Sequence, residues 1–203
     1  MMPTFSLNCF PCIEWLARAE KAGEICIEAQ ENFQKQSFRN RFEILSSSGK
    51  FSCVLPAHRP SGEKIKFTQI EFEHNINWGK DAMGAIEAAY SSSPYYLYYF
   101  EEVFDLIKHP PKKIFDFNLA ALSILKKGLS LDFNHEFTKK WVPDIEHDFR
   151  GISHKKHKST LNFPEYAQVF SDKLSFVSNL SGLDLLFNLG PEGKLYIHEL
   201  IEN

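Results

Sequence analysis

The sequence predicts an α/β domain in which an N-terminal βαβ unit and a β-hairpin form a mixed sheet and a helical half follows; an α+β arrangement is the alternative. Three patterns predict it: strand–helix–strand at the start, two alternating segments next, and amphipathic helices after them. The 203 residues are 43% hydrophobic, enough to fill one core. We therefore expect a single domain over residues 1–203.

The βαβ unit is predicted at the start of the chain. Thr4–Phe10 is typical of a strand, Pro11 opens a helix that ends near Gly23, and Glu24–Ala29 contains the apolar run of a buried strand. A strand, a helix and a strand at this spacing indicate parallel strands joined by a helical crossover.

The hairpin follows. Arg41–Leu45 and Phe51–Leu55 alternate apolar and polar residues, and the SSSGK sequence between them contains the glycine that a hairpin turn favours. Another strand is predicted over Ile65–Phe72.

Helical patterns come next. Ser93-Pro94 predicts a helix start, with an inner stripe formed by Leu97, Phe100, Phe104 and Ile107. A second helix begins near Ile114 and ends at Gly128, where two lysines precede the glycine; its inner face is Ile114, Phe117, Ala121, Leu122 and Leu125. Residues 134–164 are polar and partly basic, and we expect a long loop or flap.

Composition excludes several classes of function. The net charge of −3 and pI of about 6.2 argue against nucleic-acid binding. No apolar run reaches the roughly 18 residues that span a bilayer, so no membrane insertion is expected. The first residues lack the basic side chains of a secretion signal, and four cysteines form no dense disulfide scaffold. A cytoplasmic location is therefore expected, and a homo-oligomer is compatible with these properties.

The segment from Gln34 to Arg41 is a candidate anion site. Its cationic and amide side chains can hold a phosphate or carboxylate; they are Gln34, Lys35, Arg39, Asn40 and Arg41. The segment follows the second strand, and ligands settle beyond the carboxyl ends of parallel strands. The alternative is a solvated, charged strand edge.

A second candidate segment is NLSGLDLLFNLGPE, residues 179–192. Ser181 and Asp184 resemble a capping box at a helix that Gly190-Pro191 would end. Beyond capping, Asn179, Ser181 and Asn188 are candidate ligand-binding residues, because a helix amino terminus attracts anions. Asp184 and Asp116 are the candidate catalytic bases.

Other motifs are weaker. Cys9 and Cys12 form a CxxC at a helix start, which suggests a thiol oxidoreductase, although buried apolar thiols explain it as well. The stretch from Arg150 to Lys158, which contains His154 and His157, is either a basic flap or a solvated loop, and no metal site is expected. The chain lacks the glycine-rich nucleotide motifs, so the cofactor remains unknown.

Five segments together resemble the WbqC-like protein family, in its compact form of about 200 residues. They are IEAQENFQKQSFRNR (27–41), AIEAAYSSSPYYLYY (85–99), IFDFNLA (114–120), YAQVF (166–170) and VSNLSGLDLLFNLGPE (177–192). There are departures: Ser178 stands where relatives often have proline, and Ala82-Met83 stands where histidine and tryptophan are expected. A histidine acting as acid or base there would be absent from this chain.

The resemblance implies a link to bacterial surface-polysaccharide (O-antigen) gene clusters. The first hypothesis is therefore the binding of a small phosphorylated or carboxylated ligand such as a sugar nucleotide, with acyl or aminoacyl transfer to it. The second is a non-catalytic scaffold that uses the basic segment and the face of Tyr95, Tyr98 and Tyr99. The third is the thiol oxidoreductase. Whether the protein is an enzyme stays open.

Overall fold

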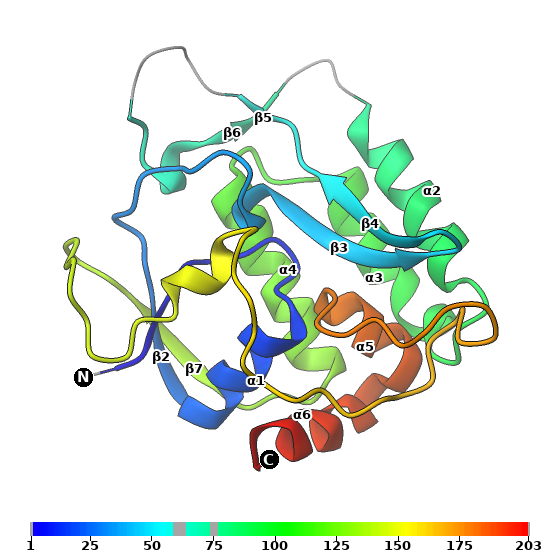
Figure 1. Ribbon diagram of the computed structural model, residues 1–203. Coiled ribbons are helices and arrows are strands. Elements are labelled where there is room, and N and C mark those ends of the chain that lie inside the picture. Colours follow the sequence, from blue (N-terminus) through cyan, green and yellow to red (C-terminus); the bar gives the residue numbers. More distant parts are fainter. Residues whose placement is uncertain (1, 59–63, 74–76, 203) are drawn as a thin grey trace.

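The computed structural model describes residues 2–58, 64–73 and 77–202 (Figure 1). A three-stranded parallel sheet has the order β1-β2-β7, and helix α1 connects its first two strands. The elements are β1 (Thr4–Phe5), α1 (Ile13–Ala22), β2 (Glu24–Ile27) and β7 (Asn134–Phe137). The predicted βαβ unit is confirmed, although β1 is shorter than expected and α1 begins two residues after Pro11. Gly23, at φ 70°, ends α1 as predicted.

Strand β7 corrects the expectation that all of residues 134–164 are irregular. It pairs in parallel with β2, Ile25 opposite His135 and Ile27 opposite Phe137. All four residues of β7 are exposed, so its sequence carries no hydrophobic alternation that could predict a strand. A short 3₁₀ helix, η3 (Arg150–Ser153), also lies in this range, and η3 packs against β1.

The predicted hairpin is confirmed as β3 (Arg41–Ser46) and β4 (Gly49–Val54), with Ser46 opposite Gly49. The strand predicted over Ile65–Phe72 is largely wrong. That segment forms the 3₁₀ helix η2 (Phe67–Gln69) and the two-residue strand β6 (Glu71–Phe72), which pairs with β5 (Ala57–His58). Phe67 and Ile70 are both buried, a spacing of three that suits a 3₁₀ turn.

The helices form the remainder of the domain, with α4 at its centre (Figure 1). They are α2 (Trp78–Tyr90), α3 (Tyr96–Lys108), α4 (Ile114–Gly128), α5 (Gly182–Leu189), η4 (Gly190–Glu192) and α6 (Gly193–Glu202). The inner face predicted for α4 is buried throughout, and α4 ends at Gly128 as expected. Within the described ranges, every helix is too short or too polar to cross a membrane. Parallel and antiparallel sheets with helices fit the predicted α/β class or its α+β alternative.

Helix α3 differs from its prediction in its start and in the first residue of its inner stripe. Ser93 donates its hydroxyl to the Tyr90 carbonyl (2.7 Å) instead of capping the helix, which begins at Tyr96. Leu97 is 77% exposed, whereas Tyr96 is buried. The buried stripe therefore runs through Tyr96, Val103 and Ile107. The predicted stripe is right at Ile107, which is buried, and at Phe100 and Phe104, which pack against the core. It is wrong at Leu97, because Tyr96 is buried instead, with its ring on Phe187.

The amino termini of α1 and α5 hold each other in place. The Ile13 amide donates to the Leu180 carbonyl (3.0 Å), and the Glu14 amide donates to Asn179 Oδ1 (2.9 Å). In return, the Gly182 amide donates to the Pro11 carbonyl (2.7 Å). Amides at a helix start have no partner within their own helix, so each segment satisfies the other's. The NLSG sequence thus joins both ends of the chain in one core.

Candidate functional site

The segments that follow β2 and β7 lie together at the carboxyl edge of the parallel sheet. Thr138 joins them: the Ala29 amide donates to its hydroxyl oxygen (2.9 Å), and that hydroxyl donates to Glu28 Oε1 (2.6 Å). Gln30 Nε2 also donates to the Thr138 carbonyl (3.3 Å). Because β2 and β7 run in parallel, both end at the same edge, which is where ligands bind in sheets of this kind.

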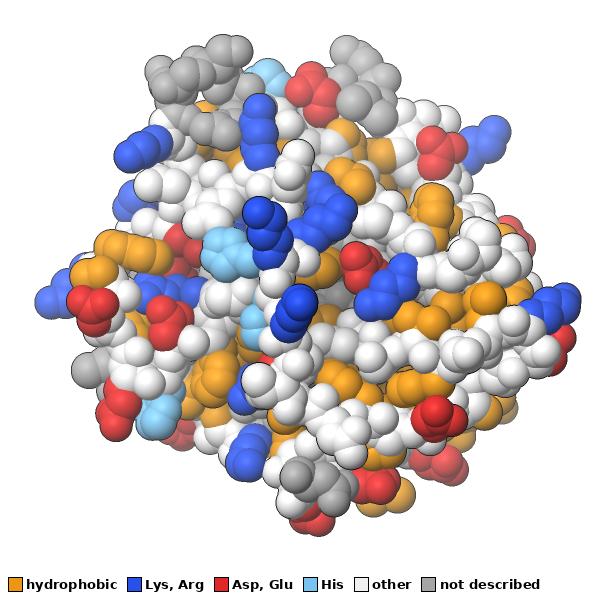
Figure 2. Space-filling view, viewed as in Figure 1, with side chains coloured by type: hydrophobic (Ala, Val, Ile, Leu, Met, Phe, Trp, Pro, Cys, Tyr) orange, Lys and Arg blue, Asp and Glu red, His pale blue; other side chains and the backbone are white. Residues whose placement is uncertain are grey.

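A groove of about 620 Å³ opens above this joined floor. Its lining contains three ammonium groups, four amide or indole side chains and one carboxylate: Lys66, Lys139, Lys140, Gln30, Asn32, Gln34, Trp141 and Glu31. On the face drawn in Figure 2, basic side chains lie along the upper left, where these segments run.

The groove has an excess of free positive charge. Lys139 and Lys140 are exposed, and within the described part of the chain no hydrogen bond or ion pair engages their ammonium groups. Lys66 Nζ donates to Gln30 Oε1 on the same wall. The only carboxylate in the described lining, Glu31, is already neutralised by Arg39. An anion entering the groove therefore meets unpaired cations.

Trp141 forms one wall and is held by Arg150. The guanidinium carbon of Arg150 lies 4.2 Å from the centroid of the Trp141 ring. Arg150 is buried and donates to the carbonyls of Val142 and Pro143 and to Asp148 Oδ2, at 2.9, 2.9 and 2.6 Å. The hydrogen bond from Arg150 lowers the pKa of Asp148. The indole, 49% exposed, is thus fixed on one face and open to solvent elsewhere.

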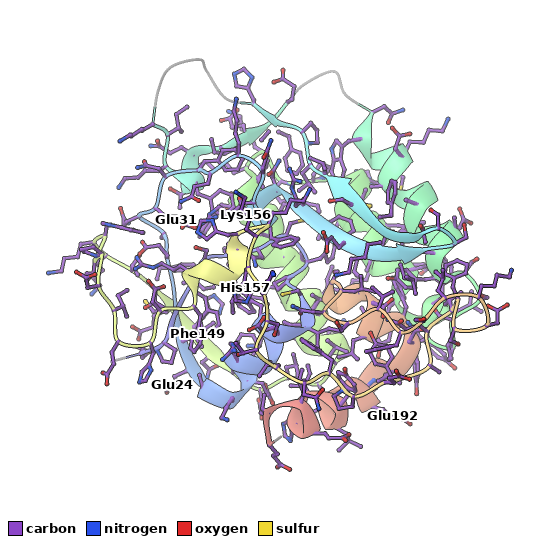
Figure 3. The ribbon with its side chains drawn as sticks, viewed as in Figure 1. Glu24, Glu31, Phe149, Lys156, His157 and Glu192 are labelled. Carbon is purple, nitrogen blue, oxygen red and sulfur yellow. The ribbon has the colours of Figure 1, made fainter. Side chains whose placement is uncertain are left out.

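Beneath the groove, Arg39 and Glu31 form a buried ion pair. Arg39 Nε donates to Glu31 Oε1 (2.8 Å) and Nη2 donates to Glu31 Oε2 (2.5 Å). Ser6 lies between them, accepting from Arg39 (2.7 Å) and donating to Glu31 (2.8 Å). Figure 3 labels Glu31 on the segment after β2. The bidentate pair ties this segment to Arg39, and Ser6, which directly follows β1, ties both to the end of that strand.

A second buried carboxylate, Glu14 in the first turn of α1, meets the segment after η3. Glu14 Oε2 lies 2.9 Å from His157 Nε2, and Oε1 accepts from Arg18 Nε (2.8 Å). Asn179 Nδ2 approaches the same carboxylate at 3.5 Å. Figure 3 shows His157 beside the start of α1. A carboxylate that orients a partly exposed imidazole is an arrangement able to accept a proton.

A family model described as the WbqC-like protein family matches residues 8–159, which is more than half of the chain. The chain belongs to the WbqC-like protein family. No curated protein and no solved structure was found to be similar. The matched range includes both walls of the groove and the Glu14–His157 pair. It ends before two of the segments that resemble the family, YAQVF and VSNLSGLDLLFNLGPE.

Of the predicted basic segment, Gln34 alone lines the groove in this WbqC-like protein. Lys35 is exposed, and Asn40 is buried with its amide donating to the Leu55 carbonyl (2.9 Å). Arg41 is half-buried in β3, opposite Val54. Arg39 lies in the core, where its Nη1 has no partner among the described residues. The structure therefore separates these side chains and does not collect them in one cleft.

The C-terminal motif residues are engaged inside the protein. Asn179 caps α1, Ser181 Oγ accepts from the Leu183 amide (3.2 Å), and Asn188 donates to the Asp184 carbonyl (2.8 Å). The N-cap at Ser181 and the helix end at Gly190 are confirmed. The amides of the first turn of α5 are bonded within the protein, so its amino terminus offers no open anion site.

Asp184 corrects the predicted capping box. Its carboxylate accepts from Tyr90 Oη (2.9 Å), Gln168 Nε2 (2.9 Å) and Tyr166 Oη, and it points away from the backbone amides of its own helix. Burial raises the pKa of Asp184, and the three donors oppose that rise. It is fully enclosed, whereas Asp116 is exposed in the first turn of α4.

The cysteines disfavour the thiol chemistry. Cys9 and Cys12 carry free thiols. Burial raises the pKa of Cys12 to about 12 and that of Cys9 well above its usual value. A reactive thiol requires a lowered pKa, so buried apolar thiols describe this CxxC better. Within the described residues, no cluster of His, Cys, Asp or Glu could hold a metal ion.

Sequence reasoning missed Lys139, Lys140 and Trp141, and it missed the pairing of Glu14 with His157. The Lys-Lys-Trp run directly follows β7, so recognising that strand would have placed the run at the carboxyl edge. No local signal links Glu14 with His157, because 143 positions separate them.

Proposed function

We propose that this WbqC-like protein binds an anionic small molecule, a sugar nucleotide, in the groove beyond β2 and β7. The observation that carries the proposal is the position of Lys66, Lys139 and Lys140 around one groove at the carboxyl edge of a parallel sheet. The ammonium groups of Lys139 and Lys140 have no partner among the described residues, so a phosphate need not displace an existing ion pair.

The rest of the lining suits the uncharged part of such a ligand. Gln30, Asn32 and Gln34 can donate to and accept from sugar hydroxyls, and a groove of about 620 Å³ has the volume of a typical small-molecule site. Free phosphate binding would leave these amides unused. A sugar nucleotide uses both the cations and the amides.

The reaction that we propose for the bound sugar nucleotide is acyl or aminoacyl transfer in surface-polysaccharide biosynthesis. Family membership supports this chemistry, because the resemblance links the family to such gene clusters. An amine of the sugar would attack an activated acyl ester or thioester, and the alcohol or thiol of that carrier would leave with the proton of the amine. His157, oriented by Glu14, does not line the groove and is given no role in this step. Binding without turnover is the alternative, and the same groove serves it.

Calorimetry with UDP-N-acetylglucosamine tests the binding proposal. The double variant Lys139→Ala/Lys140→Ala should bind at least tenfold more weakly, since each charged contact contributes about 1.5–3 kcal/mol. Lys108→Ala is the matched control, because Lys108 is an exposed lysine at the end of α3 and does not line the groove. Equal affinities for wild type and the double variant, or no binding by wild type to this or other nucleotide sugars, would overturn the proposal.

A further inference from the structure

We propose that Trp141 is the stacking platform for the nucleobase of the bound ligand, so that the site selects a nucleoside diphosphate and not merely a diphosphate. The inference rests on the proposed function, because it concerns the same groove. The indole ring would recognise the nucleobase, whereas the lysines would recognise only the diphosphate.

One face of the ring packs against the protein. Arg150 covers one face at 4.2 Å and is itself held by Asp148 and by two backbone carbonyls. Arg150 also reaches Glu28 Oε2 (3.4 Å), which belongs to the segment joined by Thr138. A flat side chain that is already fixed loses little conformational entropy when a second ring stacks on it.

The partly exposed Trp141 lines the groove beside the cations. Trp141 is 49% exposed and lines the groove together with Lys139 and Lys140, the two residues that precede it. A base on the indole therefore places its attached diphosphate within the reach of these lysines. Proteins that hold single-stranded nucleic acids combine a positively charged groove with aromatic side chains on which bases stack, and this groove has both elements.

The arginine behind the ring favours a base over a sugar. A sugar ring approaches an indole through partly positive C–H groups, which need the negative charge of the aromatic face. Arg150 lies on the opposite face and draws on that same charge. A polarised, planar base depends less on this charge, so stacking remains favourable. The sugar is then left to the amides Gln30, Asn32 and Gln34.

Affinities for UDP and for inorganic pyrophosphate, measured by calorimetry on three proteins, test the inference. Wild type should bind UDP more tightly than pyrophosphate. Trp141→Ala should lose roughly tenfold or more in UDP affinity and keep its pyrophosphate affinity, because stacking on an aromatic ring contributes about 1–3 kcal/mol per base. Trp141→Phe should recover most of the UDP affinity. An unfolding midpoint close to that of wild type verifies that each variant is folded.

Tryptophan fluorescence adds a second readout. UDP should quench the emission of wild type, and Trp141→Phe should abolish the quenching, since Trp15 is fully buried and Trp78 lies outside the groove. If UDP and pyrophosphate bind equally and Trp141→Ala weakens neither, the inference fails while the anion groove stands. If neither probe binds wild type, the proposed function fails as well.

Discussion

Charged side chains are exposed in the groove beyond β2 and β7, whereas those of the buried motif residues bond to other parts of the protein. In the groove, Lys139 and Lys140 are exposed and without partners among the described residues. In the core, Arg39 meets Glu31 and Asp184 meets Tyr90 within hydrogen-bonding distance. A buried charge must be paired, whereas a binding site needs charges that are still available. The most recognisable motif residues therefore hold the fold together, and less conspicuous ones line the groove.

The first prediction concerns the buried ion pair. Arg39→Ala leaves the Glu31 carboxylate enclosed with only Ser6 as a donor among its described side-chain partners, and removal of one partner from a buried pair costs about 3–5 kcal/mol. Urea unfolding measures the loss. Lys35→Ala, an exposed change four positions earlier, should stay within about 0.5 kcal/mol. An Arg39→Ala protein as stable as wild type would contradict the assignment of Arg39 to the residues that hold the fold together.

The second prediction concerns Asp184. Asp184→Ala deprives Tyr90, Tyr166 and Gln168 of their common acceptor. Because the carboxylate itself is costly to bury, we expect a smaller loss, about 2–3 kcal/mol. Asp116→Ala is the control, since Asp116 is exposed, and both proteins can be compared by thermal unfolding. Equal stabilities would show that the Asp184 network contributes nothing.

The third prediction separates the two roles of Asn179, which caps α1 and has φ 55°. Asn179→Ala should lose about 2 kcal/mol, roughly one for the cap and one for the left-handed backbone. Asn179→Gly should lose only about half of that, because glycine adopts positive φ freely. If the two variants unfold at the same denaturant concentration, backbone conformation at this position is not a source of stability.

The smallest expected effect is a pH dependence near the groove. The hydrogen bond from Arg150 lowers the pKa of Asp148 in the folded protein below its usual 3.8. Its contribution to stability is therefore present above pH 3.8 and is lost as the pH falls through the lowered pKa. Stability should fall less steeply with acid in Asp148→Asn than in wild type. Parallel acid titrations, followed by circular dichroism, decide this.

Much of the fold followed from hydrophobic periodicity. The spacing of apolar residues predicted α1, the hairpin and α4, because each of these elements has an apolar face that packs in the core. Strand β7 was not predicted, because its residues are all exposed and it joins the sheet through backbone pairing with β2. The inner stripe of α3 was predicted except at its first residue: Tyr96 is buried against Phe187, and Leu97 is exposed.

The site was less predictable for a related reason. Arg39 was predicted to hold the anion of a ligand, and in the structure it pairs with the Glu31 carboxylate of the same chain. Local sequence does not say whether an arginine is buried with such a partner or left open for a ligand. Lys139 and Lys140 belong to the basic part of the expected loop. Their position in a groove follows from the parallel pairing of β2 with β7, which the sequence did not indicate.

One paired measurement tests the division between groove and core most directly: UDP-N-acetylglucosamine affinity and urea unfolding, both on Lys139→Ala/Lys140→Ala and on Asn179→Ala. The lysine variant should lose at least tenfold in affinity, since each charged contact contributes about 1.5–3 kcal/mol, and keep the stability of wild type. The asparagine variant should lose about 2 kcal/mol of stability and keep the affinity of wild type. The reverse pattern, with binding lost at Asn179 and retained without the two lysines, would contradict the account.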